Sequence, residues 1–462
     1  MTFKVVLLIA IYLVLVPVYS EAHARKEPVE FSGLEERLNT LEDRLLKLEK
    51  GMELVLQGLE KLTPAGEQVR DLTDSSVSLL GEVRELTAEV EAEAEFEKTI
   101  TEKSSSQKQF GTIDQNGFQN KPFGGYMEMH LNHDNINPTV LDFHRFVLLY
   151  SHQFNNRIRF VGELEIEHAL VEGGEESGEL ELEQAYLDFM LSPALSFRAG
   201  MMITPMGIVN ERHEPASFNG VERPFVDSVI IPTTWFGQGA GLVGDLGRGF
   251  SFKAFGMSSL NSSFFSANQG FQGGKQKGFF DTVSHIAGVG RLEYAGIPDL
   301  NLGVSFWAGE TGFDFDLSGK LQIFEFDGEW RWKRFSTRGQ FVITSLTDAD
   351  AINRSLQLKS GINPNIAEAM RGFYLEGGFQ LFPIKMQQEL VSFYRYENFN
   401  TQHQMPAGFL PLNQFDRSAH VIGLTYFPHP DIAFKFDYNF MRNASSVVQV
   451  PNRWNFGLGW WF

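Results

Sequence analysis

Strict alternation of apolar and polar residues is the feature that most constrains how this 462-residue chain can fold. In residues 432–440 every second side chain is aromatic or aliphatic, and the residues between them include Ala433, Lys435, Asp437 and Asn439. Successive side chains of a β-strand point to opposite faces, so this period of two predicts a strand with one apolar and one polar face. Residues 324–333 and 157–167 repeat the pattern.

Sixteen such strands can be placed after residue 117, at 123–133, 141–153, 156–170, 179–192, 194–204, 236–246, 249–259, 282–295, 299–309, 321–333, 335–347, 371–383, 386–398, 416–428, 431–441 and 452–462. A soluble sandwich also alternates, with its apolar face turned inward. The even strand number, and the alternation of short turns with long stretches, instead favour a closed barrel with lipid outside and water inside. We therefore predict an all-β transmembrane barrel of sixteen antiparallel strands over residues 117–462.

The first residues have the features of an export signal. Lys4 precedes an apolar run at 5–18, and Ala22-His23-Ala24 forms an A-x-A cleavage site. The run is short for a membrane-spanning helix, although an uncleaved membrane anchor is the alternative. We expect a signal peptide at 1–24 and a location in the bacterial cell outer membrane.

Residues 25–97 have the heptad spacing of a helix. Apolar residues from Phe31 to Leu62 recur at alternating steps of three and four, and the pattern resumes at Val69. This spacing predicts an α-helical coiled coil, a periplasmic extension that precedes the barrel, although a helix packed on its own domain is the alternative. The seam does not fix the number of helices. Residues 98–116 are acidic and then polar, which is typical of a linker.

The composition excludes several classes of function. The formal charge is −19, from 39 basic and 58 acidic residues, so nucleic acid is not expected as a partner. Cysteine is absent, which excludes disulfides and thiolate metal sites. His130 and His133 are three residues apart on a predicted strand and would face opposite sides, so we expect no metal site there. We expect no cofactor, and without a Ser-His-Asp arrangement we expect no enzyme.

The C-terminal residues form an amphipathic strand that ends on an aromatic residue. Its apolar face contains Trp454, Phe456, Leu458, Trp460 and Phe462. A terminal Phe on such a strand resembles the signal that outer-membrane insertion machinery recognises. Trp460 and Phe462 are therefore the predicted insertion signal, and a bilayer and that machinery are predicted partners.

Several short motifs resemble the phosphate-selective porin O/P family. They lie at 185–189 (AYLDF), 195–204 (LSFRAGMMIT), 205–207 (PMG), 210–215 (NERHEP), 220–224 (GVERP) and 231–235 (IPTTW). The resemblance implies a trimeric sixteen-strand barrel with an N-terminal coiled coil. It also implies passive diffusion of small hydrophilic solutes or ions, with a preference for anions or phosphate in some members.

The segment from Pro205 to Trp235 is too long for a hairpin turn and is the candidate pore constriction. By resemblance it would fold into the barrel. Its candidate constriction residues are Glu211, Arg212, His213, Glu222 and Arg223. The alternative is that the Glu–Arg pairs only brace the loop against the wall.

Strand parity also predicts which basic residues line the lumen. They include Arg157, Arg159, Arg198, Lys253, Arg338, Arg395 and Lys435, and also Arg291, Arg331, Lys333 and Arg453. Parity places as many carboxylates there, and the constriction segment contains no Lys, so a dominant anion field is not expected.

Two functions remain open from the sequence. The first is a porin for small hydrophilic solutes, assembled as a homotrimer. The alternative is a structural envelope tether, in which the barrel anchors a periplasmic coiled coil that reaches toward peptidoglycan. A closed transporter of hydrophobic substrates would need an apolar plug, which the sequence does not indicate.

Overall fold

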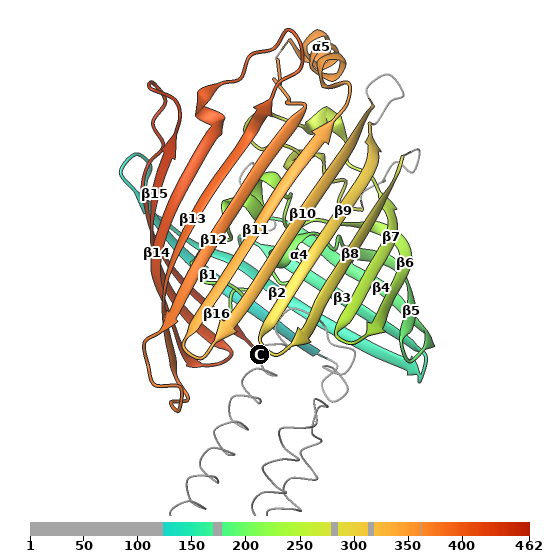
Figure 1. Ribbon diagram of the computed structural model, residues 1–462, viewed down its shortest axis with the longest axis vertical. Helices are drawn as coiled ribbons and strands as arrows, with labels where there is room; N and C mark the ends of the chain where they lie inside the picture. The colour runs from blue at the N-terminus through green and yellow to red at the C-terminus, as the bar shows by residue number, and fades with distance from the viewer. Residues whose placement is uncertain (1–122, 170–177, 279–284, 313–317, 362) are drawn as a thin grey trace, which may run out of the picture. The chain divides into compact units, whose positions relative to one another are not determined.

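The computed structural model describes residues 123–169, 178–278, 285–312, 318–361 and 363–462. The predicted signal peptide (1–24), coiled coil (25–97) and linker (98–116) lie outside these residues. The described part of the chain forms one closed sheet of antiparallel strands (Figure 1).

Sixteen strands follow one another around the sheet, and each pairs with its neighbours in sequence. They are β1 (Phe123–Asp134), β2 (Val140–Asn155), β3 (Ile158–Glu167), β4 (Leu180–Ser192), β5 (Leu195–Ile203), β6 (Phe236–Gly247), β7 (Phe250–Ser258), β8 (Ile286–Ile297), β9 (Leu300–Thr311), β10 (Gly319–Trp332), β11 (Phe335–Leu346), β12 (Ala369–Gln380), β13 (Glu389–Gln404), β14 (Asp416–His429), β15 (Ile432–Asn443) and β16 (Arg453–Trp461). β16 pairs with β1, so no sheet edge is left open. The predicted sixteen-strand antiparallel barrel is confirmed.

The two ends of the barrel differ. At one end short turns join the strands, for example between β10 and β11, and the C-terminus lies at this end (Figure 1). At the other end the connections are longer and contain η2 (Ser262–Phe264), η3 (Gln272–Gly274), α5 (Ala349–Ser360) and η5 (Asn413–Phe415). Within the described residues, the helices are too short or too polar to cross a membrane.

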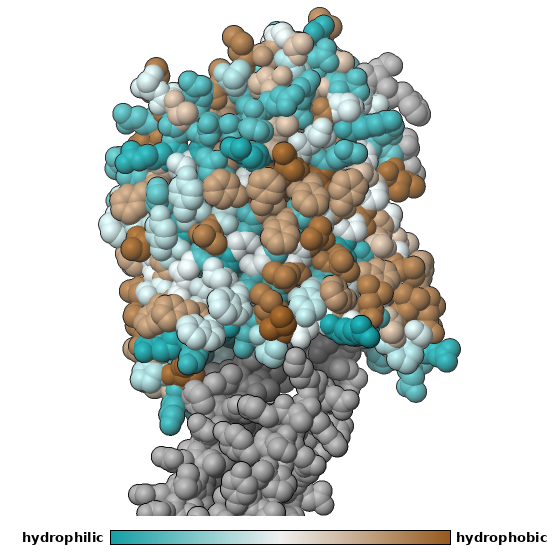
Figure 2. All heavy atoms as spheres, in the orientation of Figure 1, coloured by the Kyte–Doolittle hydropathy of each residue, from teal (hydrophilic) through white to brown (hydrophobic). Residues whose placement is uncertain are grey.

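The outer face of the strands is apolar. On β15 the ring of Phe434 is 48% exposed, whereas its neighbours Ala433 and Lys435 are buried. On β10 Phe324 and Phe326 are exposed, whereas Glu325 between them is 0% exposed. Figure 2 shows apolar residues over the middle and lower parts of the strands and polar residues gathered over the long connections. The alternation therefore turns aromatic rings outward and charged groups inward.

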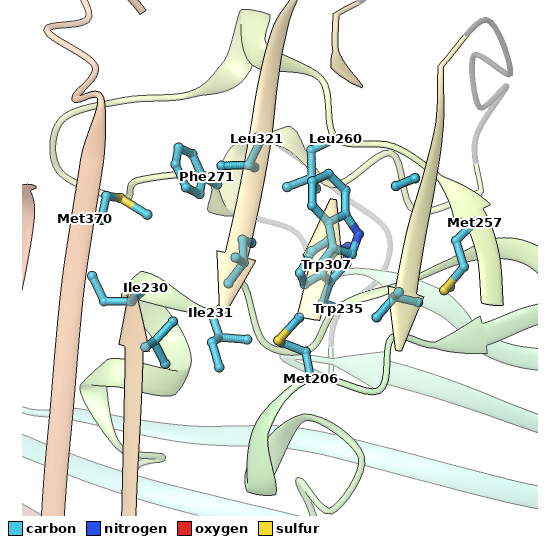
Figure 3. Packing of buried hydrophobic residues seen from close by; sticks show 14 of the residues in the cluster. Met206, Ile230, Ile231, Trp235, Met257, Leu260, Phe271, Trp307, Leu321 and Met370 are labelled. Atoms are coloured by element: carbon cyan, nitrogen blue, oxygen red, sulfur yellow. The ribbon is translucent and has the colours of Figure 1, made fainter. Parts of the chain in front are cut away.

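The interior is not polar throughout. Inward residues of β7 to β12 pack against three connections, β5–β6, β7–β8 and β11–β12, in a buried apolar cluster. It includes Met206, Ile230, Ile231, Trp235, Leu260, Phe271, Trp307, Leu321 and Met370 (Figure 3). The rings of Trp235 and Trp307 lie 5.4 Å apart between centroids. The sequence does not predict this apolar filling, because alternation does not reveal a strand whose inner face is also apolar. On β9 Phe306 points outward and the adjacent Trp307 inward, so both faces are aromatic.

The last residues close the barrel beside its first strand. The Phe462 amide donates to the Gly125 carbonyl at 3.0 Å, and the Gly125 amide donates to the Phe462 carbonyl at 3.3 Å. The Phe462 ring is 53% exposed and stacks on Phe146, with 6.0 Å between ring centroids. Trp460 pairs with Met127 and Ile432 on the neighbouring strands. The structure thus places both residues of the predicted insertion signal at the seam between β16 and β1.

Candidate pore constriction

The connection between β5 and β6 folds into the barrel interior. We call residues 204–235 the inner loop; it contains the short α4 (Gly207–Asn210) and η1 (Val226–Ile230). Asn210 ties the two ends of the loop together, because its side-chain amide donates to the carbonyls of Thr204 at 2.7 Å and of Trp235 at 3.0 Å. The Asn210 Oδ1 atom accepts a bond from the Trp235 amide at 2.7 Å. The loop therefore begins and ends at one point of the wall.

The inner loop reaches several parts of the wall between these ends. α4 packs against β9 and β10, and η1 packs against β12 and β13. The Val221 amide donates to Asp437 of β15 at 2.6 Å, and Asn132 of β1 donates to Glu222 at 2.8 Å. The Val226 amide donates to Glu397 of β13 at 3.2 Å. These bonds hold the loop across the interior, where it narrows the space inside the barrel.

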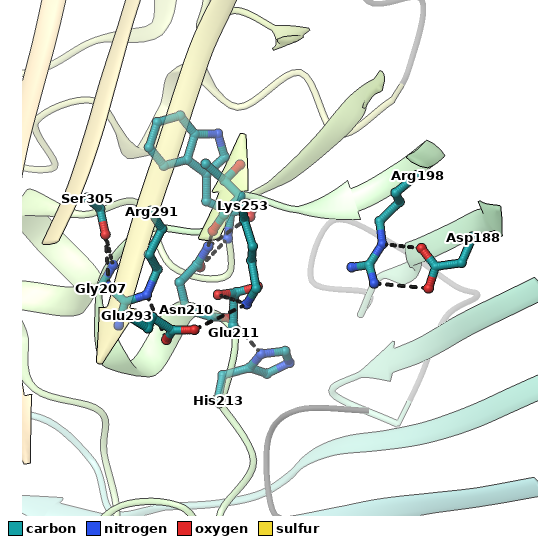
Figure 4. A network of polar contacts seen from close by, with 12 residues as sticks. Asp188, Arg198, Gly207, Asn210, Glu211, His213, Lys253, Arg291, Glu293 and Ser305 are labelled. Carbon is teal, nitrogen blue, oxygen red and sulfur yellow. Dashed lines mark hydrogen bonds and ion pairs between the residues drawn. The ribbon is translucent and has the colours of Figure 1, made fainter. Parts of the chain in front are cut away.

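Glu211 faces Lys253 of β7 and Glu293 of β8 (Figure 4), and Arg212 faces Glu329 of β10. Lys253 donates to both carboxylate oxygens of Glu211 at 2.7 Å and lies 3.9 Å from Glu293. Arg212 lies 3.7 Å from Glu329. A cavity of about 220 Å³ remains beside these pairs, and its lining includes Gly207, Glu211, Arg212, Lys253, Arg291 and Glu329. Opposed charges thus line this cavity.

Arg291 forms the centre of an ionic network on the same wall. Its guanidinium donates to Asp327 at 2.6 Å, to Glu293 at 2.9 Å and to the hydroxyl of Ser305 at 2.8 Å. Charge-assisted bonds of this kind fix side chains in place and leave little free charge. Strand parity in the sequence also turns Arg291 toward the lumen.

The other three constriction residues lie at different places. His213 is buried, and its Nε2 atom lies 3.3 Å from Glu183 of β4. Glu222 lies against β1, 3.4 Å from His130. Arg223 donates to Thr234 at 2.9 Å, within the inner loop. The structure therefore does not gather the five predicted residues into one ring: Glu211 and Arg212 face the cavity, and the others fasten the loop.

The surroundings shift the pKa values of two inner-loop carboxyls in opposite directions. Around Glu222 burial opposes ionisation, but hydrogen bonds and positive charge from His130 and a bond from Asn132 outweigh it, and the pKa falls to about 2. Burial, with the nearby charge of Glu397, raises the pKa of Asp227 to about 8. The Gln340 amide, with its NH₂ toward the carboxylate, lies 3.0 Å from both Asp227 oxygens. Glu222 is therefore an anion at neutral pH, and Asp227 is mostly neutral.

Most of the predicted lumen-lining basic residues point inward and are paired with carboxylates. Arg159 donates to Asp188 at 2.9 Å, and Arg198 donates to the same carboxylate at 2.7 Å (Figure 4). Arg338 binds Glu329, and Arg395 donates to Glu397 at 2.8 Å and to Glu376 at 3.1 Å. Because each of these arginines is paired with a carboxylate, they do not form a patch of positive charge on the inner wall.

Two of the predicted lumen residues lie in other surroundings. Lys435 is buried, and its Nζ atom lies 3.9 Å from the centre of the Phe218 ring, a cation–π contact with the inner loop. Arg157 lies in the exposed turn between β2 and β3, outside the strand ladder. Its placement on the lumen wall needs correction, because strand parity does not extend into a turn.

Comparison with known proteins gives one clear relative. No family model matches the chain. A protein of Aquifex aeolicus (strain VF5), described as uncharacterized, is 34% identical over 325 residues, which are 68% of this chain and 74% of that protein. The chain belongs to the same family as this Aquifex protein.

Several solved structures are similar to this chain. They include a loop-deletion mutant of OmpT, an outer membrane protein of Vibrio cholerae, with a TM-score of 0.48, 11% identity, and coverage of 74% of this chain and 98% of that chain. An anion-selective porin from Comamonas acidovorans also has a TM-score of 0.48, 11% identity, and coverage of 74% of this chain and 98% of that chain. The outer membrane channel DcaP of Acinetobacter baumannii has a TM-score of 0.48, 10% identity, and coverage of 74% and 96%.

The local sequence does not single out two residues that position the inner loop. Asn210 was considered only as part of a motif, although a buried Asn between two loop ends is a typical loop staple. Gly207 has a φ of +74°, and a Cβ atom there would lie 2.3 Å from the Gln340 side chain. The Pro-Met-Gly sequence before α4 was the available signal, since a glycine in such a turn often has a positive φ.

Proposed function

We propose that this protein is an outer-membrane porin through which small hydrophilic solutes and ions diffuse passively. The observation that carries the proposal is the inner loop, which lies inside a closed sixteen-strand barrel and leaves a cavity lined by opposed charges. Selection by width and charge at a constriction requires this arrangement and no catalytic group. We accordingly propose no enzymatic activity.

The outer face of the barrel supports a location in a bilayer. The strands have 9 to 16 residues, and a tilted crossing of the hydrocarbon needs about 9–11. Apolar side chains such as Phe324, Phe326 and Phe434 would face lipid. A closed barrel also satisfies every ladder hydrogen bond within the sheet, as a membrane-spanning sheet must. The outer membrane, reached through an export signal, is the location that we propose.

Charge pairing in the interior supports weak selectivity. Phosphate recognition needs clustered Arg or Lys with little competing carboxylate. Arg159, Arg198, Lys253, Arg338 and Arg395 each bind a carboxylate instead. We therefore favour a pore with little preference between small ions. A preference for anions or phosphate, which the resemblance to the O/P family implies, is the finer alternative.

Planar bilayers test both proposals. The full-length protein, refolded in detergent, should insert and conduct in KCl, and the reversal potential in a KCl gradient should be small. Heat-denatured protein is the control. Failure to conduct, with the barrel intact, would contradict the porin function. A strongly anion-selective current that millimolar phosphate reduces would instead establish the phosphate alternative.

Assembly is a separate part of the proposal. We propose a homotrimer, so conductance should rise in steps of three equal levels. A single level per insertion, together with a monomeric mass in detergent, would contradict the trimer and leave the pore intact.

The heptad pattern at 25–97 motivates a second, compatible role as an envelope tether that reaches toward peptidoglycan. Deletion of residues 25–110 should then loosen the envelope while solute uptake stays unchanged. An unchanged envelope would argue against the tether.

A further inference from the structure

A group of two carboxylates and one imidazole is buried where the inner loop meets β3 and β4. Glu163, Glu183 and His213 are 3%, 1% and 2% exposed. One potential ligand atom from each residue lies within 4.8 Å of the other two. The His213 Nε2 atom is 3.3 Å from Glu183 Oε2 and 3.9 Å from Glu163 Oε1. Neither His213 Nε2 nor Glu183 Oε2 has a hydrogen-bond partner among the described residues.

The hydrogen bond on the other side of the His213 ring fixes its tautomer. The Nδ1 atom lies 3.0 Å from the carbonyl oxygen of Asn210. A carbonyl oxygen can only accept, so Nδ1 must carry the proton that it donates. In the neutral ring Nε2 then has a free lone pair directed at carboxylate oxygens. Two acceptors at such a distance repel each other unless a cation lies between them, and metal-binding histidines are held in this way.

A β-bulge brings Glu183 to this place. In the pairing of β3 with β4, Glu163 lies opposite Gln184 and Leu164 lies opposite Leu182, so Glu183 is the additional residue. A bulge of this kind redirects a side chain out of regular alternation. It turns Glu183 inward, beside Glu163. The Gln184 amide donates to Glu163 Oε2 at 2.5 Å and so orients the carboxylate, with Oε1 toward His213.

The surroundings contain an excess of negative charge. Glu165 and Glu214 are also buried, and one oxygen of each has no hydrogen-bond partner among the described residues. The nearby Arg145 donates to Glu128 at 2.5 Å and lies 3.9 Å from Glu165, and it and Arg223 are shared among a larger number of carboxylates. Buried anions are costly unless they are paired or coordinate a metal. A divalent cation would balance the two carboxylates that face His213.

We propose that Glu163, Glu183 and His213 bind a divalent transition-metal ion that fastens the inner loop to the barrel wall. Imidazole nitrogen with carboxylate oxygen is a donor set for Zn²⁺ and its neighbours, whereas Ca²⁺ and Mg²⁺ prefer oxygen ligands alone. Zn–N and Zn–O bonds of about 2.0–2.1 Å in a tetrahedron separate the ligand atoms by about 3.3 Å. His213 and Glu183 already have this separation. His213 belongs to the loop and the carboxylates belong to the wall, so the ion would cross-link them.

Zn²⁺ binding to the full-length refolded protein tests the proposal. The protein is stripped with a chelator, incubated with Zn²⁺ and desalted, and bound metal is counted by mass spectrometry. The test variants are Glu183→Gln and His213→Gln, which preserve size. His403→Gln is the matched control, because His403 is exposed on β13. His168→Gln tests the other group of possible ligands, Asp142, His144 and His168, which lies nearer solvent. Unheated gel electrophoresis confirms that each variant forms a barrel.

We expect one Zn²⁺ per chain in the wild type, His403→Gln and His168→Gln, and affinity lower by at least about a hundredfold in the two test variants. Co²⁺ in place of Zn²⁺ should give the visible absorption of a tetrahedral site in the wild type and not in His213→Gln. Any one of three results would overturn the proposal: the wild type retains no Zn²⁺, the test variants retain as much Zn²⁺ as the wild type, or Zn²⁺ is lost only in His168→Gln. The first result would mean that a proton, and not a metal, separates His213 from Glu183.

Discussion

Asn210 shows how one side chain determines the position of a long loop. Its amide bonds to the main chain of Thr204 and Trp235, which lie at the two ends of the inner loop. Asn210 is 0% exposed, so water cannot replace these bonds. The same residue accepts, through its own carbonyl, the proton of His213. Asn210 therefore holds the two ends of the loop together and also orients the imidazole of His213.

Replacement of Asn210 by Ala should loosen the inner loop without dissolving the barrel. The change leaves two buried carbonyls and one buried amide with fewer partners, a cost of about 2–4 kcal/mol in loop docking. Hydrogen exchange at the Trp235 amide measures this cost directly, and we expect exchange to be faster by one to three orders of magnitude, roughly, for that energy. Asn363→Ala, in an exposed connection, is the control. Unchanged protection at Trp235 would show that the loop is held by its other contacts.

Asp227 should make the stability of the inner loop depend on pH. Its pKa in the folded protein, about 8, lies above the ordinary value of 3.8, so the folded state holds a proton that the unfolded chain releases. The stabilisation is full below the ordinary pKa, is lost as the pH rises from there through about 8, and changes little at higher pH. Glu397 and Asp327 increase this effect and Arg338 opposes it.

Thermal unfolding of the refolded protein between about pH 6 and about pH 9 tests this dependence. We expect the wild-type unfolding temperature to fall across this range more than that of Asp227→Asn, whose side chain cannot ionise. Glu211→Gln, at a carboxylate that already binds Lys253, is the control and should retain the wild-type slope. Parallel curves for the wild type and Asp227→Asn would refute the assignment of this effect to Asp227.

At the scale of elements, the sequence predicts the strands well and the inner loop poorly. Alternation and turn residues are local, so all sixteen predicted segments overlap the observed strands; the largest difference is at β13, which continues to Gln404 beyond the predicted end at 398. The path of the inner loop depends instead on contacts such as that between Asn219 and Glu376, which are 157 residues apart. Local patterns contain no information on such pairs.

The same limit applies to the interior of the barrel. Alternation predicted an apolar outer face, but it could not show that the inner faces of β9 to β11 are apolar beside the inner loop. Nor could it show that Glu163, Glu183 and His213 meet, because a bulge changes the parity of β4 at Glu183. The sequence predicts the amphipathic strands. Tertiary packing decides which residues of different strands and loops come into contact.

The pair of Lys253 and Glu211 should set the charge balance at the cavity. Lys253→Ala leaves Glu211 and Glu293 without their lysine partner, which makes the cavity more negative and should shift the reversal potential toward cation selectivity. Glu211→Gln leaves Lys253 with one carboxylate partner fewer and should shift the reversal potential toward anion selectivity. Both shifts should shrink at high salt, because lumen charges are screened.

Arg157→Ala is the matched control for these measurements, since Arg157 lies in an exposed turn. It should leave the reversal potential unchanged. Shifts of the same sign in Lys253→Ala and Glu211→Gln would mean that ions pass elsewhere, and that this pair only braces the loop.

At the scale of the whole molecule, Phe462 lies at the seam where β1 and β16 close the barrel. The main chain of Phe462 makes two hydrogen bonds with Gly125, and its ring lies on the outer face against Phe146. A Cβ atom at Gly125 would lie 2.6 Å from the Phe462 ring, so this glycine makes room for it. Phe462 thus combines a structural bond at the seam with the exposed ring that we predict the insertion machinery to recognise.

Two variants separate these roles. Phe462→Ala retains the backbone bonds and removes the ring, so refolding in detergent should stay near the wild-type yield while assembly in cells falls several-fold. Deletion of Phe462 removes the ring and the backbone bonds. It should lower the refolding yield and the assembly in cells, because two hydrogen bonds between β16 and β1 are lost. The yields are measured by unheated gel electrophoresis of refolded protein and of outer-membrane fractions. If Phe462→Ala assembles in cells as well as the wild type, the ring is not the signal. If its refolding in detergent fails too, the ring is needed to close the barrel itself, since no insertion machinery is present in that experiment.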